Sequence, residues 1–112
     1  MKAVKGVASG TDALRLAVRA TGLEPGDEVL IQANAFVAAL YETGVRPVPI
    51  DIREDDLGPD ARALAAAVTP NTRAILVVHL YGFGEILLLP VHPDLTDAEV
   101  ALVIAAVESF FV

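Results

Sequence analysis

The sequence contains no cysteine and no tryptophan. Without cysteine the chain can form neither disulfide bonds nor thiolate metal sites. Positive charge is also scarce, since eight Lys and Arg stand against fifteen Asp and Glu, which gives a net charge of −7. This balance disfavours nucleic-acid phosphate and an anionic membrane surface as partners. The two histidines lack the spacing of metal ligands, so no metal site is predicted.

Long apolar runs are absent as well. The longest spans residues 100–107, far short of the ~20 residues that a membrane-spanning helix needs. The first twelve residues contain no apolar stretch of the kind found in a secretory signal. We therefore expect a cytoplasmic protein with no membrane partner.

The chain is rich in apolar residues for its length. Of its 112 residues, 54% are hydrophobic, and the mean hydropathy is +0.57. A small domain has much surface relative to its volume and normally needs more polar residues than this. The composition favours a chain that is buried within a larger body.

Apolar runs alternate with helical periodicity over the first 84 residues, which predicts an α/β fold with a small, mostly parallel sheet and flanking helices. Pro49 cannot donate a backbone hydrogen bond, so its strand is expected at a sheet edge. An apolar run at 86–91 and a capping box at Thr96 and Glu99 predict a C-terminal strand and helix. Strands are expected at residues 4–8, 28–31, 46–51 and 74–78, and helices at 12–21, 35–43 and 60–68.

The turn at Gly10, Thr11 and Asp12 is the best candidate for a ligand site. Glycine permits close approach of a ligand to the backbone, and a helix N-terminus offers unpaired N–H groups to a phosphate. A second interpretation stays open, in which Ser9, Thr11 or Asp12 only caps the helix. The stretch matches neither the Walker pattern nor the dinucleotide-binding glycine pattern.

Three further side chains follow predicted strands at their carboxyl ends. Phe36 could stack on a flat cofactor ring or belong to the core. His79 and Tyr81 could donate hydrogen bonds to a ligand or serve the structure alone. The acidic cluster at 54–56 is interpreted as a solvated loop, and no catalytic triad is evident.

Several short motifs occur in an order that resembles the N-terminal part of the DegT/StrS-type sugar aminotransferases. Residues 89–96 and the helix after them resemble the C-terminus of the same family. The N-terminal motifs are Ser9-Gly10-Thr11-Asp12-Ala13-Leu14, Gly26-Asp27-Glu28-Val29, Ala33-Asn34-Ala35-Phe36-Val37-Ala38, Pro47-Val48 before Asp51, Thr69-Pro70-Asn71-Thr72 and His79-Leu80-Tyr81-Gly82.

The resemblance implies that residues 1–84 form part of a cofactor-binding large domain and that residues 85–112 are the family's C-terminal segment. It implies pyridoxal phosphate as cofactor, bound by Gly10, Thr11, Asp12 and Phe36. It also implies a nucleotide-linked keto-sugar and an amino donor as substrates, and a homodimer. One departure is Ala35, where the family usually has threonine.

The middle of the family is missing between these two parts. That middle carries the lysine that forms the Schiff base and the aspartate that pairs with the pyridine nitrogen. Transamination needs an amine to hold the cofactor and move a proton, and the chain has only Lys2 and Lys5. We therefore assign no catalytic residue and expect a truncated, non-catalytic member. Two alternatives are a module that still binds phosphate or pyridoxal phosphate, and an enzyme completed by a partner chain.

Self-association is a further expectation. The strand at 74–78 is apolar throughout and needs neighbours on both sides. The link to the run at 86–91 is too short for a parallel crossover, so the two can pair only as an antiparallel hairpin or not at all. The final helix adds an apolar seam that needs a surface to cover it. The seam consists of Val100, Ile104, Val107 and Phe111.

Overall fold

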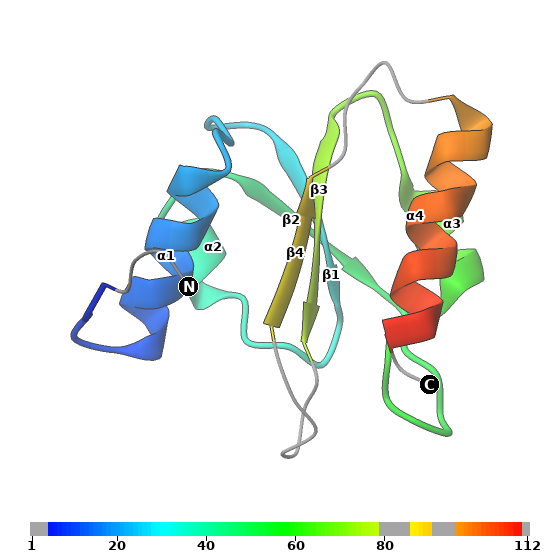
Figure 1. Cartoon of the computed structure of the whole chain (residues 1–112), viewed down its shortest axis with the longest axis horizontal. Helices are drawn as coiled ribbons and strands as arrows, with labels where there is room; N and C mark the ends of the chain where they lie inside the picture. The colour runs from blue at the N-terminus through cyan, green and yellow to red at the C-terminus, as the bar shows by residue number, and fades with distance from the viewer. Residues whose placement is uncertain (1–4, 79–85, 91–95, 111–112) are drawn as a thin grey trace.

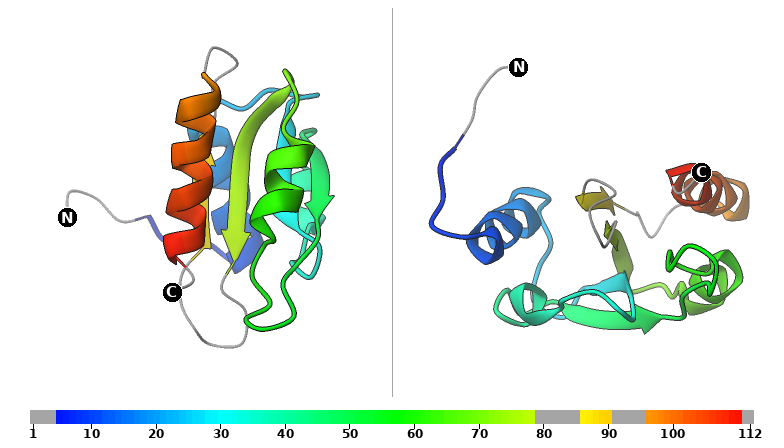
Figure 2. Two further views of the ribbon diagram at one scale, coloured as in Figure 1. Left: turned by 90° about the vertical axis from the view of Figure 1, so that its right-hand side faces the viewer. Right: turned by 90° about the horizontal axis from the view of Figure 1, so that it is seen from below.

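The computed structural model describes residues 5–78, 86–90 and 96–110. A four-stranded sheet in the order β2-β1-β3-β4 divides the molecule, with α1 and α2 on one face and α3 and α4 on the other (Figures 1 and 2). The predicted α/β class is thus confirmed. The elements are α1 (Gly10–Ala20), β1 (Glu28–Gln32), α2 (Ala38–Tyr41), β2 (Arg46–Ile50), α3 (Ala61–Ala67), β3 (Thr72–Val78), β4 (Ile86–Pro90) and α4 (Asp97–Phe110).

The sheet is parallel except at β4. β1 pairs in parallel with β2 and β3, whereas β4 pairs antiparallel with β3, from Ala74 opposite Pro90 to Val78 opposite Ile86. The short connection allows only this hairpin arrangement. β2, with Pro47 and Pro49, lies at an edge as predicted, because proline cannot complete a ladder on both sides.

Two apolar clusters fill the two sides of the sheet. Side chains alternate between the faces of a strand, so Ile31 and Leu76 point toward α1 and α2, while Leu30 and Ile75 point toward α3 and α4. β3 is buried on both faces, as its apolar run predicts. Val103 and Ile104 of α4 pack on the second cluster, so part of the predicted seam is covered within the chain.

Most helix ends follow the local signals. Asp60 caps α3 by accepting hydrogen bonds from the N–H groups of Arg62 and Ala63. The capping box at α4 forms, with Thr96 Oγ1 accepting from the Glu99 N–H and the Glu99 carboxylate accepting from Thr96. These hydrogen bonds from Thr96 lower the pKa of the Glu99 carboxyl below its ordinary value.

Two predicted elements were wrong in extent. The strand expected at 4–8 is not formed over residues 5–8, which are exposed and have no ladder partner among the described strands. The helix expected at 35–43 shortens to the four residues of α2, because Val37 at its start offers no capping side chain. Gly44, with φ 81°, ends that segment in the left-handed region.

Candidate functional site

The start of α1 leaves backbone donors free. Ser9 is the N-cap, and its Oγ accepts a hydrogen bond from the Asp12 N–H at 3.2 Å. Of the capping residues considered from the sequence, it is Ser9 that caps the helix. Within the part of the chain that the structure describes, the N–H groups of Gly10 and Thr11 have no acceptor. The first turn of α1 therefore presents two donors to solvent.

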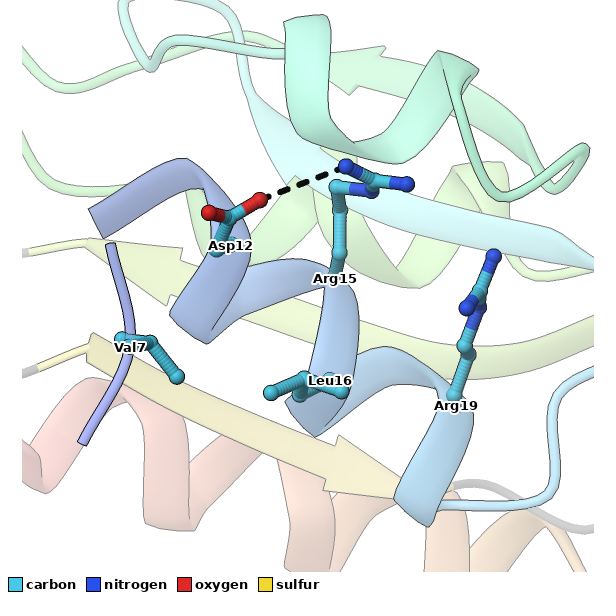
Figure 3. A pocket seen from close by; sticks show the side chains of 5 residues that line it. All are labelled: Val7, Asp12, Arg15, Leu16 and Arg19. Atoms are coloured by element: carbon cyan, nitrogen blue, oxygen red, sulfur yellow. Dashed lines mark hydrogen bonds and ion pairs between the residues drawn. The ribbon is translucent and has the colours of Figure 1, made fainter. Parts of the chain in front are cut away.

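Charge around this turn is balanced by an arginine. Asp12 Oδ1 lies 3.3 Å from Arg15 Nη1 (Figure 3). Arg15 Nε lies 3.1 Å from Glu42 Oε2, but its N–H does not point at that oxygen, so this contact is an ion pair without a hydrogen bond. Arg15 was not among the predicted site residues, although its spacing of three residues from Asp12 on a predicted helix is the signal of such a pair.

A shallow hollow of about 240 Å³ lies along the exposed side of α1 (Figure 3). Asp12, Arg15 and Arg19 form one side of it, and Leu16 and Val7 lie on the other. The hollow is a feature of the α1 surface and does not include Phe36.

Phe36 lies in the connection between β1 and α2 and is 73% exposed. The alternative interpretation of Phe36 as a core residue was therefore wrong. This connection and the first turn of α1 both lie at the edge of the sheet where the parallel strands end (Figure 1). Open α/β sheets bind their ligands at this edge. His79 and Tyr81, the other two candidates, lie outside the described residues.

A buried glutamine, which was not among the predicted site residues, joins two strands at the same edge. Gln32 Oε1 accepts the Val78 N–H at 2.9 Å, and Gln32 Nε2 donates to Asn34 Oδ1 at 3.0 Å. Asn34 Nδ2 in turn donates to the Leu57 carbonyl at 3.2 Å. These bonds hold the start of the connection that carries Phe36. The available signal was a polar residue directly after the apolar run Val29-Leu30-Ile31 of a predicted buried strand.

Residues 1–85 match the sequence model of the DegT/DnrJ/EryC1/StrS aminotransferase family. The chain belongs to this family. The match covers the whole of the segment in which the ordered motifs occur, and it ends where the sequence order changes.

Similar proteins of the family are sugar aminotransferases. Over 80 residues the chain is 48% identical to a dTDP-3-amino-3,4,6-trideoxy-alpha-D-glucose transaminase from Streptomyces venezuelae, covering 69% of this chain and 21% of that protein. It is 45% identical over 80 residues to a UDP-N-acetyl-3-dehydro-alpha-D-glucosamine 3-aminotransferase from Acidithiobacillus ferrooxidans, with coverages of 69% and 22%. The chain thus spans about a fifth of the length of the relatives it matches.

Solved structures of the family share the fold. The chain matches 3-amino-5-hydroxybenzoic acid synthase with a TM-score of 0.67 and 33% identity, covering 92% of this chain and 25% of that one. It matches NtdA from Bacillus subtilis, solved with bound cofactor PMP, with a TM-score of 0.64 and 42% identity, covering 69% and 18%. Among the described residues, no helix has the length and apolar character needed to cross a membrane.

Proposed function

We propose that this chain is a truncated, non-catalytic member of the DegT/DnrJ/EryC1/StrS family. The observation that carries the proposal is its lysine content, which is limited to Lys2 and Lys5. Lys5 is exposed in the segment before α1 and belongs to no described strand. A transaminase needs a lysine amine fixed beside its cofactor, and in sequence neither Lys2 nor Lys5 corresponds to the lysine of the family.

We expect no transaminase activity from the purified chain. The test incubates it with pyridoxal phosphate, an amino donor and a nucleotide-linked keto-sugar, and measures keto-acid release. Borohydride trapping followed by mass spectrometry reports any Schiff base on Lys2 or Lys5. Turnover together with a trapped adduct on either lysine would contradict the proposal. Turnover only after addition of a longer family member that keeps its lysine but carries an inactivated phosphate-binding turn of its own would favour an enzyme completed by a partner chain.

The residues at the carboxyl edge of the sheet fit the phosphate group of the family's cofactor. Gly10 and Thr11 offer free N–H groups at the positive end of α1, and Arg15 offsets the carboxylate of Asp12. The exposed ring of Phe36 is available for stacking. In a complete aminotransferase the bound cofactor supplies the electron sink for amino transfer; in this chain these residues would only hold it.

Phosphate binding can be tested by removing one N–H group from α1. Gly10 is the first residue of the helix, where proline is tolerated, and Ser9 is already extended, as a residue before proline requires. We expect Gly10→Pro to weaken binding of inorganic phosphate and pyridoxal phosphate by about ten- to a hundredfold, since a hydrogen bond to a charged group is worth about 1.5–3 kcal/mol. NMR titration measures both the affinity and the location of the shifts.

Gly10→Ala is the matched control. It keeps the N–H group, and its added Cβ would meet no atom within 4 Å, so binding should be retained. Equal affinities of the two variants, or shifts confined to the acidic loop at 54–56, would show that the first turn of α1 is not the site.

Three other assignments belong to the same proposal. Residues 1–84 correspond to part of the family's cofactor-binding domain and residues 85–112 to its C-terminal segment, although one sheet runs across this division through the β3–β4 pair. The cytoplasm is the proposed location. A nucleotide-linked keto-sugar and an amino donor are the proposed ancestral substrates, as the names of the relatives support.

A further inference from the structure

The hollow along α1 is separate from the first turn of that helix. Neither Gly10 nor Thr11 lines it. Its volume is about 240 Å³, and an apolar cavity of roughly 150 Å³ is enough to hold benzene. The hollow therefore has room for a single small ring with a substituent. Its lining residues are Val7, Asp12, Arg15, Leu16 and Arg19 (Figure 3).

Two arginines lie on the same side of this hollow (Figure 3). Arg15 and Arg19 are four residues apart on α1, so their side chains are neighbours on one face of the helix. Two positive charges at this spacing repel each other. An anion that lies between the two guanidinium groups removes this repulsion.

Both guanidinium groups have donors left for a ligand. Arg15 Nη1 bonds to Asp12, and Arg15 Nε lies near Glu42, whereas Arg15 Nη2 has no partner among the described residues. The guanidinium of Arg19 has neither a hydrogen bond nor an ion pair within the same residues. The two carboxylates thus offset the charge of Arg15 and leave that of Arg19 uncompensated. The planar fork of a guanidinium matches a carboxylate, which accepts two parallel hydrogen bonds.

The carboxylate of Asp12 opposes an anion in this hollow only weakly. It is already paired with Arg15 Nη1 at 3.3 Å. Asp12 also lies seven residues before Arg19, which is roughly 10 Å along a helix axis. This separation is about the Debye length at physiological ionic strength.

The other side of the hollow is apolar. Leu16 is 50% exposed and Val7 is 41% exposed, and their side chains point toward each other (Figure 3). A ring that covers these two side chains removes apolar surface from water. A fully hydrated anion such as phosphate gains nothing from this side. The hollow therefore favours anions that carry an apolar group.

We propose that this hollow binds a small carboxylate with an apolar ring. The carboxylate accepts hydrogen bonds from Arg15 Nη2 and from Arg19, and the ring covers Leu16 and Val7. One ligand then satisfies the unused donors and the exposed apolar side chains together. This site is distinct from the proposed phosphate site at the first turn of α1.

An NMR titration of the full chain with benzoate tests the site. At constant ionic strength we expect saturable shifts at the amides of Val7 and of residues 15–19, with a dissociation constant in the millimolar range. Benzamide has nearly the same shape without the charge, and acetate has the charge without the ring. Each should bind at least about fivefold more weakly than benzoate.

Two substitutions separate the polar from the apolar contribution. Arg19→Gln removes the uncompensated guanidinium, and Leu16→Asn removes the apolar contact. Each is expected to raise the benzoate dissociation constant by at least about fivefold. Arg62→Gln on α3 and Leu102→Asn on α4 are the matched controls and should leave it unchanged. All four side chains are exposed, so the fold should persist, as circular dichroism can verify.

The same titration shows which results overturn the proposal. Shifts centred on Gly10 and Thr11 would mean that the helix N-terminus binds the carboxylate. Shifts that do not saturate, equal affinity for benzamide, or an Arg19→Gln variant that binds like wild type would each contradict the site. The phosphate titration of the same chain reports on the first turn separately. The failure of this site and the failure of the proposed function can therefore be told apart.

Discussion

Replacement of Leu30 by alanine is expected to lower the free energy of unfolding by about 2–5 kcal/mol. Leu30 lies in β1 between two other strands, and its side chain is 0% exposed. It belongs to the cluster that joins the sheet to α3 and α4. The loss of its methyl groups leaves a cavity that packed neighbours on all sides cannot close. The free energy of unfolding of a domain is roughly 5–15 kcal/mol in total. This single substitution therefore removes a large share of the stability.

Urea unfolding followed by circular dichroism measures the effect. Leu102→Ala, studied in dilute solution, is the control with the same chemistry at an exposed position, and it should change the stability by no more than about 0.5 kcal/mol. Similar small effects at both positions would mean that the core is loosely packed. A broad transition for the wild-type chain would lead to the same conclusion.

Gln32→Leu is expected to destabilise the fold by about 1–3 kcal/mol, even though it replaces a buried polar side chain by an apolar one. Gln32 is 1% exposed, and its carboxamide satisfies the N–H of Val78 and the side chain of Asn34. Leucine would leave the partly buried Val78 N–H without its side-chain acceptor at the point where β1 and β3 end. The connection that carries Phe36 would lose its anchor through the same change.

Amide hydrogen exchange distinguishes the loss of the Gln32–Val78 hydrogen bond from a general loosening of the core. The amide of Val78 should exchange faster in Gln32→Leu than the global loss of stability accounts for, while amides in β2 follow the global change. Asn34→Ala removes only the outer end of the network and is expected to have the smaller effect. If both variants were equally stable, the glutamine bridge would contribute nothing beyond packing.

Local features of this protein were determined by the sequence alone. The caps at Ser9, Asp60 and Thr96 each involve hydrogen bonds to groups two or three residues away, so no distant partner is needed for them to form. The buried strands follow from their continuous apolar runs. The prolines of β2 predict an edge strand, because in any sheet a residue without an N–H group cannot donate a hydrogen bond to a neighbouring strand.

The tertiary structure decided every feature that depends on a partner far along the chain. The segment at 5–8 has the composition of a strand but pairs with none of the described strands. Gln32 and Val78 are 46 residues apart, and no local pattern indicates their bond. Leu14 and Leu16 are alike in sequence, yet one packs on the sheet and the other faces solvent. The periodicity of a helix shows which residues share a face, but only the packing of the whole chain determines which faces are covered.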